Sequence, residues 1–200
     1  MHRRSATTEL MKIVLKDEYL RLTIDRYAMT EDVGAGGPCE VGIKLREGRA
    51  REERIRGSGV GIVDALYHGL IDHYAPEYPS LKTIRFTGFA VNGRMDTTRA
   101  QGADAEAVVT LLVQNSDEQT FEFERAGRSL VAAALGVVLE AAEYFVNSER
   151  AFVSVYRALV DARARNRQDL VQQYTSQLAE LVNTTSYSEV IERIKSDAAL

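Results

Sequence analysis

The sequence predicts an α+β fold of two similar strand-hairpin-helix units, with antiparallel sheets packed on helices, followed by a helical C-terminal extension. Three observations support this prediction. A pair of β-type segments runs into a glycine and then into an apolar helix twice in the 200 residues. Each unit has one apolar sheet face and one apolar helix stripe, which a single unit could not hide from water. The last fifty residues show only helical periodicity. The two units must therefore pack together, by pseudo-twofold pairing within the chain or in a dimer.

The predicted organisation has three regions. Residues 1–18 form an N-terminal arm, residues 19–150 form the tandem repeat, and residues 151–200 form the helical extension. Within the repeat, unit one spans residues 19–78 and unit two spans residues 81–150. We expect the arm to be flexible or to form a short helix. The apolar residues of that short helix are Leu10, Met11 and Val14.

Composition and charge exclude several classes of protein. The chain is 45% hydrophobic and 27% charged, as is usual for a globular protein. The net charge is −4, and no cluster of lysine and arginine is interleaved with aromatic residues, which argues against a nucleic-acid partner. Cys39 is the only cysteine, so no internal disulfide forms and a reducing cytoplasm fits. No stretch approaches the roughly twenty apolar residues of a membrane helix, and the N-terminus does not resemble a secretory signal. We therefore expect a cytoplasmic protein that binds neither nucleic acid nor membranes.

Unit one begins with a strand rich in β-forming residues from Tyr19 to Met29, and a glycine-rich loop ends this strand. A hairpin with one buried face follows, because apolar and other residues alternate from Val41 to Leu45. Glu47-Gly48 then turns the chain into a mostly polar returning strand. The next helix has apolar residues at helical spacing over residues 62–71, and the prolines from Pro76 onward end it.

Unit two repeats this order. Its predicted elements are a strand from Leu81 to Val91, a turn at Asn92-Gly93, a glycine-bearing loop through Gly102, a strand from Glu106 to Val113, a turn at 115–117, a strand from Gln119 to Arg125 and an alanine-rich helix from Ser129. In the predicted alignment of the units, residues 40–45 match residues 106–111. Gly59 and the helix after it match Gly127 and the helix after that glycine.

The helix from Ser129 is apolar on nearly every side, so we expect it to be buried at the centre of the fold or at a subunit interface. Asn147-Ser148 has the residue types of a helix cap and predicts a break in the chain's helical structure at this point. Apolar periodicity then predicts three more helices, over residues 152–160, 170–182 and 187–194.

The first strand-to-helix junction, Gly57 to Gly61, is the feature most informative about function. Glycines at alternate positions leave no side chains over the backbone, and a helix that starts there offers unpaired N–H groups and the positive end of its dipole. A small molecule that bears a carboxylate suits such a place. The same pattern is also typical of a tight strand-to-helix connection that binds nothing.

Residues suited to catalysis or metal binding are few. The three histidines are His2, His68 and His73, and they form neither an HxH nor an HExxH motif. Cys39 has no local base, and a small buried thiol is the simpler interpretation. Adjacent carboxylates on a strand or turn face opposite ways and do not converge. The sequence therefore predicts no catalytic residue, no metal and no cofactor.

These features together resemble the C-terminal regulatory, or dimerisation, domain of 2-isopropylmalate synthase and of the related citramalate and homocitrate synthases. The resemblance covers roughly Tyr19 to Arg150. It rests on the junction from Gly57 to Ala65, on the segment from Gly102 to Val109, and on Gly127 leading into an alanine-rich helix.

The resemblance implies a homodimer that binds an end-product amino acid, such as leucine or isoleucine, near the dimer interface and between the two units. The implied pocket walls are Gly57, Gly59, Gly61, Ile62, Val63, Asp64 and Ala65 at the first junction and Ala103, Asp104 and Ala105 at the second. Helix N-termini would take the carboxylate of the ligand, and Asp64 or Asp104 its ammonium group. Family members usually have proline where this chain has Ile62 and threonine where it has Ala103, so the pocket floor differs.

The catalytic part of the family has no counterpart here. Those synthases condense acetyl-CoA in a metal-dependent (β/α)8 barrel, which takes roughly 250 residues. The resemblance therefore implies a module that is not itself an enzyme and acts on a separate catalytic synthase subunit. Three hypotheses follow: a regulatory module that binds a ligand, a dimerisation or interaction scaffold that keeps only the fold, and an enzyme with an unrecognised site.

Overall fold

The computed structural model describes residues 2–48, 51–95, 105–182 and 190–192. It confirms the predicted α+β class, with two antiparallel three-stranded sheets and a helical C-terminal part. In chain order the elements are α1 (His2–Leu15), the 3-10 helix η1 (Lys16–Glu18), β1 (Leu22–Thr30), β2 (Cys39–Glu47), β3 (Arg51–Gly59), α2 (Ile62–Tyr74), the 3-10 helix η2 (Pro79–Thr83), β4 (Arg85–Met95), β5 (Ala105–Gln114), β6 (Thr120–Gly127), α3 (Leu130–Ala164) and α4 (Gln168–Leu181).

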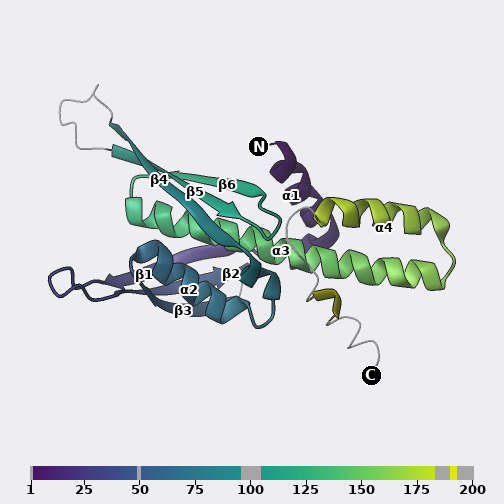
Figure 1. Cartoon of the computed structure of the whole chain (residues 1–200), viewed down its shortest axis with the longest axis horizontal. Coiled ribbons are helices and arrows are strands. Elements are labelled where there is room, and N and C mark those ends of the chain that lie inside the picture. The colour runs from purple at the N-terminus through teal and green to yellow at the C-terminus, as the bar shows by residue number, and fades with distance from the viewer. Residues whose placement is uncertain (1, 49–50, 96–104, 183–189, 193–200) are drawn as a thin grey trace.

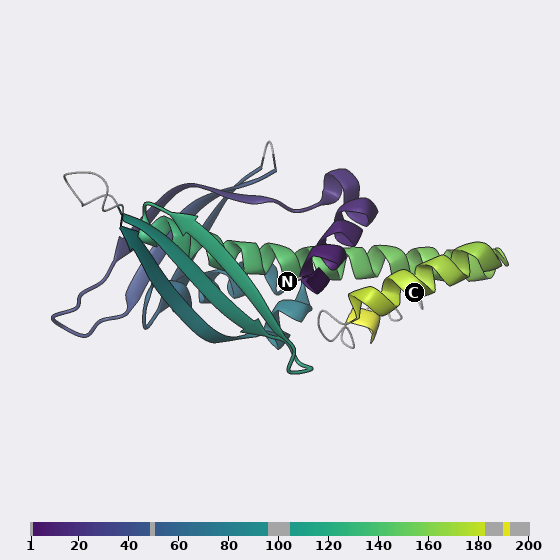
Figure 2. The same ribbon diagram turned by 90° about the horizontal axis from the view of Figure 1, so that it is seen from above.

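The long helix α3 is the axis of the molecule and lies between the two sheets (Figure 1). One sheet has the order β1-β2-β3 and the other has the order β4-β5-β6. Helix α3 packs on β5 and β6 and also reaches β1, whereas α2 packs on β3 and β2 and contacts α3. Past the sheets, α4 folds back along the second half of α3, and α1 packs across the middle of α3 (Figure 2). Helix α2 therefore covers much of the apolar face of the first sheet, and α3 covers much of that of the second.

The two units have the same hydrogen-bonding register. Each sheet has an irregularity in its first strand, after Ile24 in β1 and after Phe86 in β4. Ile24 lies opposite Leu45 in β2, and Phe86 lies opposite Val113 in β5. Leu45 and Val113 therefore occupy the same place in the two sheets, and the residues on either side of them correspond one by one.

This register corrects the predicted alignment of the middle strands. Gly59 ends β3 and pairs with Cys39, and Gly127 ends β6 and pairs with Ala107. Cys39 is thus the counterpart of Ala107, so the predicted match of residues 40–45 with residues 106–111 was wrong by two residues. A shift of two keeps every side chain on its own face of the strand, and apolar alternation alone therefore cannot detect it.

The second unit also differs from the prediction at its start. Residues Pro79–Thr83 form the 3-10 helix η2, so β4 begins at Arg85 rather than at Leu81. The predicted turn at Asn92-Gly93 was wrong, because both residues pair with β5 inside the ladder. An Asn-Gly pair favours a hairpin turn, but long-range strand pairing takes precedence here. The predicted loop through Gly102 lies outside the described residues.

Helix α3 does not break at Asn147-Ser148, so the predicted cap there was wrong. Asn147 is fully buried in the middle of the helix, and its Oδ1 accepts from the Leu20 N–H at 2.8 Å. Its Nδ2 donates to the Leu20 carbonyl oxygen at 2.9 Å. The amide thus satisfies the backbone of a segment far away in sequence instead of a helix end. The helix crosses the predicted boundary between residues 150 and 151, and this boundary stays a prediction.

The N-terminal arm is the helix α1, so the helical alternative was the right one. Met11 is fully buried and Leu15 is buried, and both belong to one core cluster with residues of both sheets and of α3.

Among the described residues, α3 is long and apolar enough to cross a membrane by length and composition alone. However, 72% of its most apolar 18-residue window is buried inside the protein, as is usual for a core helix.

Candidate functional site

The first junction brings β3 and α2 together backbone to backbone. A Cβ added at Gly57 would lie 1.8 Å from the carbonyl oxygen of Ala65 and 2.8 Å from the amide nitrogen of Gly69. A Cβ added at Gly59 would lie 2.3 Å from Oδ2 of Asp64. Only glycine allows these approaches, so Gly57 and Gly59 serve the packing of the strand on the helix.

Gly61 has a different environment from the other two glycines. It is the N-cap residue of α2 in an extended conformation, and it makes no side-chain cap hydrogen bond. A Cβ added there would meet nothing within 4 Å. The corresponding N-cap of α3 is Ser129, whose Oγ accepts from the amide N–H of Ala132 at 3.2 Å. The N-terminus of α2 is therefore the more open of the two helix starts.

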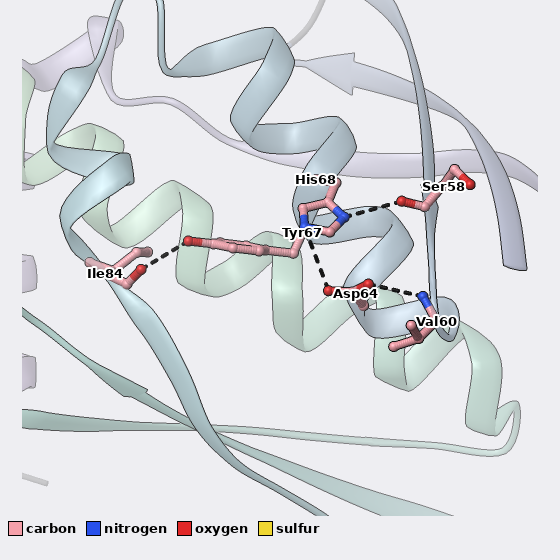
Figure 3. A network of polar contacts seen from close by, with 6 residues as sticks. All are labelled: Ser58, Val60, Asp64, Tyr67, His68 and Ile84. Atoms are coloured by element: carbon pink, nitrogen blue, oxygen red, sulfur yellow. Dashed lines mark hydrogen bonds and ion pairs between the residues drawn. The ribbon is translucent and has the colours of Figure 1, made fainter. Parts of the chain in front are cut away.

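A polar network, drawn in Figure 3, occupies the first turns of α2. Oδ2 of Asp64 accepts from the amide N–H of Val60 at 3.0 Å, and Oδ1 lies 3.7 Å from Nε2 of His68. Nδ1 of His68 lies 3.1 Å from the carbonyl oxygen of Ser58, which assigns the proton to Nδ1. Asp64, expected to take a ligand's ammonium group, is thus bonded within its own junction.

One residue of α2 links the two units. The hydroxyl of Tyr67 donates to the carbonyl oxygen of Ile84 at 2.9 Å, just before β4 begins. The Tyr67 ring also packs on Phe86 of β4, with 4.4 Å between the ring centroids. Burial raises the pKa of the Tyr67 hydroxyl above its ordinary value. This contact was not predicted from the sequence, because a half-buried tyrosine on an amphipathic helix has no pattern of its own.

The other predicted pocket residues have different environments, and their role in a pocket stays a prediction. Ile62 and Val63 are half-buried against the core, and Ala65 is fully buried. Ala105 is the first residue of β5 and pairs with Met95. Ala103 and Asp104 lie outside the described residues. Neither of the two cavities described next is lined by a residue of the first junction.

The first cavity, of about 400 Å³, lies beside the second half of α3. Nη1 of Arg150 donates to the carbonyl oxygen of Glu18 at 2.9 Å, and its guanidinium carbon lies 5.6 Å from the ring centroid of Tyr78. The Tyr78 hydroxyl donates to Glu77, and burial is the main cause that raises its pKa to about 12. Glu149 is 1% exposed and accepts from the amide N–H of Ser80. Three charged residues around this cavity, Glu77, Glu149 and Arg150, thus have partners within the chain.

The second cavity, of about 450 Å³, is an open groove between β1, β6 and the first half of α3. Its lining residues are Leu22, Thr23, Ile24, Asp25, Arg26, Tyr27, Arg125, Ala132, Gly136 and Leu139. The exposed side chain of Arg125 lies against the backbone of Gly136, where an added Cβ would come within 2.6 Å of its Cδ and Nε. We call this cavity the Arg125 groove.

A half-buried carboxylate, Glu143, lies one turn of α3 beyond the groove. Glu143 accepts a short hydrogen bond from the amide N–H of Leu22, at the start of β1. Burial is the main cause that raises the pKa of Glu143 to about 7, and Glu140 raises it further, while the Leu22 N–H, Arg125 and Arg21 lower it. This carboxyl group changes its charge near neutral pH.

Metal-binding clusters were not expected, and the described residues contain no group of three or more His, Cys, Asp and Glu side chains that could hold a metal ion. Cys39 is buried, as expected of a structural thiol.

Comparison with known proteins adds no assignment: the chain matches no protein-family model and no curated protein.

Proposed function

We propose that this chain is a cytoplasmic regulatory module that forms a homodimer, binds a branched-chain amino acid or a similar small carboxylate, and acts on a catalytic subunit. The observation that best supports it is a pair of exposed apolar strips in the two units. They are Tyr27 and Met29 on β1, 37% and 44% exposed, and Phe89 and Val91 on β4, 46% and 44% exposed. We call them the strand strips.

The strand strips lie on the helix-facing sides of the sheets. Tyr27 pairs with Ile43 and Phe89 pairs with Leu111, and directly opposite residues share one face of an antiparallel sheet. Ile43 and Leu111 are buried in the core, whereas the residues of the strand strips, on the edge strands, are exposed. Ile43 and Leu111 are counterparts in the common register, so Tyr27 and Phe89 are counterparts too.

A second copy of the chain is the partner that these strips favour. Most homo-oligomers are closed dimers in which the same surface of both subunits takes part. Each copy would present two matching apolar strips, and their mutual contact would remove all four side chains from water. Apolar side chains gathered on a surface in this way usually mark an interface.

The ligand part of the proposal rests on the resemblance to synthase regulatory domains and on small, carboxylate-compatible surroundings at the start of α2. Gly61 leaves the N-terminus of α2 open, and unpaired N–H groups there favour an anion. We propose no enzymatic activity for the chain itself. Two histidines lie 3.7 Å from a carboxylate oxygen, His68 from Asp64 and His73 from Glu53. His68 and Asp64 are also bonded to backbone groups of their own junction.

Light scattering during size-exclusion chromatography tests the dimer, and titration calorimetry tests the ligand. We expect a dimer mass for the natural chain and a monomer mass for the double variant Met29→Lys, Val91→Lys. Val60→Lys is the matched control, because Val60 is 93% exposed and lies outside the strand strips. A monomer at all concentrations, or a dimer that survives the double substitution, contradicts the proposal. Calorimetry with leucine, isoleucine and valine should show heat for at least one of them.

A scaffold that keeps only the fold is the second candidate, and one observation favours it. Gly57 and Gly59 are needed for packing against α2, so the glycine pattern is explained without a ligand. The two candidates differ in one outcome. A dimer that binds none of the amino acids and none of their keto acids supports the scaffold.

A further inference from the structure

We propose that the Arg125 groove binds a small carboxylate with a short branched aliphatic body, and that Arg125 takes the carboxylate. This inference rests on the proposed function for the class of ligand, and it assigns that ligand to the space between β1, β6 and α3 instead of the N-terminus of α2. Arg125 was not among the residues predicted from the sequence.

Arg125 is placed for this role by a glycine in the middle of α3. Glycine inside a helix costs about 1 kcal/mol relative to alanine, so its presence calls for a packing reason. At Gly136 an added Cβ would lie 2.6 Å from Cδ and Nε of Arg125 and 2.8 Å from its Cζ. The glycine thus leaves room for the Arg125 side chain to lie close to the helix, where it lines the groove. A planar guanidinium held in this way can donate two parallel hydrogen bonds to a carboxylate.

The positive charge of Arg125 is not neutralised by a close ion pair with any described residue. Among the described residues, no carboxylate forms an ion pair with Arg125. The acidic residue of the groove itself, Asp25, is bonded to Arg46 on β2. Glu143 interacts with Arg125 only over a longer range, and burial holds its pKa near 7, so it offsets the positive charge only in part at neutral pH. An anionic guest would complete the pairing.

The walls of the groove are suited to an aliphatic body. Leu22 and Leu139 are buried, Ile24 and Ala132 are half-buried, and Tyr27 forms the exposed lip. The volume of about 450 Å³ lies within the range of about 300–1,000 Å³ that is usual for small-ligand sites. Arg26 also lines the groove, and Asp25 is bonded to Arg46. The apolar walls would provide affinity from burial, and an ion pair with Arg125 would provide orientation.

The internal repeat shows that this arrangement is special to one unit. Arg125 pairs with Val109, and the corresponding residue of unit one is Gly57, which pairs with Val41. There the strand lies directly on α2, since Gly57 has no side chain to separate them. The Tyr67 ring fills the neighbouring space against β4. The two units thus differ at this position, because unit two has an arginine and a groove where unit one has a glycine. Packing of the sheet on the helix does not require the arginine, since unit one packs without it.

Titration calorimetry on the full chain tests the inference. The probes are leucine, its keto acid 4-methyl-2-oxopentanoate and 3-methylbutanoate, with leucinamide as the probe that lacks a carboxylate. We expect Arg125→Gln to weaken binding of the acids at least tenfold, and Arg125→Lys to keep part of the affinity. Arg54→Gln removes an exposed arginine from β3, away from the groove, and should change nothing. Circular dichroism and thermal melting confirm that each variant is folded.

The outcomes distinguish failure of this inference from failure of the proposed function. If none of the acids binds the natural chain, the proposed ligand class and the groove both fail. If the acids bind Arg125→Gln as tightly as the natural chain, but not Gly61→Trp, the ligand sits at the start of α2 and only the groove fails. If leucinamide binds as tightly as leucine, the role given to Arg125 is wrong.

Discussion

The substitution Glu143→Gln tests the electrostatics of the junction between β1 and α3. Glutamine keeps an oxygen that accepts from the Leu22 N–H, but it never carries a charge. The groups that act on Glu143 are Glu140, which raises its pKa, and Arg125, Arg21 and the Leu22 N–H, which lower it. Burial outweighs the groups that lower it and brings the pKa from 4.5 to about 7.

The sign and size of the effect follow from this change in pKa. In the unfolded chain Glu143 loses its proton near its ordinary pKa, whereas in the folded protein it holds the proton until about pH 7. The folded state therefore binds more protons between these values, and the free energy of unfolding falls as pH rises through this window. A pKa difference of one between the folded and unfolded states corresponds to about 1.4 kcal/mol, so the total loss is about 3 kcal/mol. The Gln variant does not suffer this loss.

Urea unfolding of both proteins from pH 4.5 to pH 8 measures the difference. We expect equal free energies of unfolding near pH 4.5 and a variant that is more stable by up to about 3 kcal/mol at pH 8. Taking the difference between the two proteins cancels the titration of all other groups. Glu122→Gln, an exposed residue of β6, is the control and should leave the pH dependence unchanged. A constant difference across the pH range would refute the reasoning, because it would mean that Glu143 does not titrate in this window.

Three further predictions concern stability and are checked by chemical unfolding. Gly57→Ala should cost about 3 kcal/mol or more, since its Cβ would lie 1.8 Å from a backbone oxygen, whereas Gly61→Ala, with nothing within 4 Å, should cost about 1 kcal/mol at most, for the less favourable N-cap residue; equal effects would contradict the packing role. Asn147→Ala should cost about 2 kcal/mol or more, because it leaves the buried N–H and carbonyl of Leu20 unpaired, and a neutral result would argue against this pairing. Ser129→Ala should cost about 1 kcal/mol by removing the N-cap of α3, and a larger loss would mean that the hydroxyl has another role.

Much of the fold could be predicted from local patterns. Alternating apolar residues predicted the middle strands, and polar turn residues predicted the turn at 115–117, where Oδ1 of Asn115 accepts from the amide N–H groups of Asp117 and Gln119. Ser129 was correctly placed at the start of α3. These features depend on neighbours in the sequence, and their periodicity or residue type is therefore visible there.

The candidate site was harder to predict, because its parts depend on contacts between distant residues. The glycine pattern at Gly57 to Gly61 was noticed, but its packing role became clear only with α2 laid against β3. Whether the junction also binds a ligand stays a prediction. The groove was missed because Arg125 in an exposed strand and Gly136 in an apolar helix have no special pattern separately. Only the register of β6 against α3 brings them together.

Local patterns were enough to predict the α+β class, the repetition of the strand-hairpin-helix unit and the burial of α3, because hydrophobic periodicity and turn residues act over a few positions. The common register of the two sheets, the continuity of α3 through Asn147 and the contact of Arg125 with Gly136 depend on the packing of the whole chain. A two-residue shift preserves the apolar face of a strand, and a buried amide can pair with the backbone of any distant segment. Such choices are settled only when the whole core packs together.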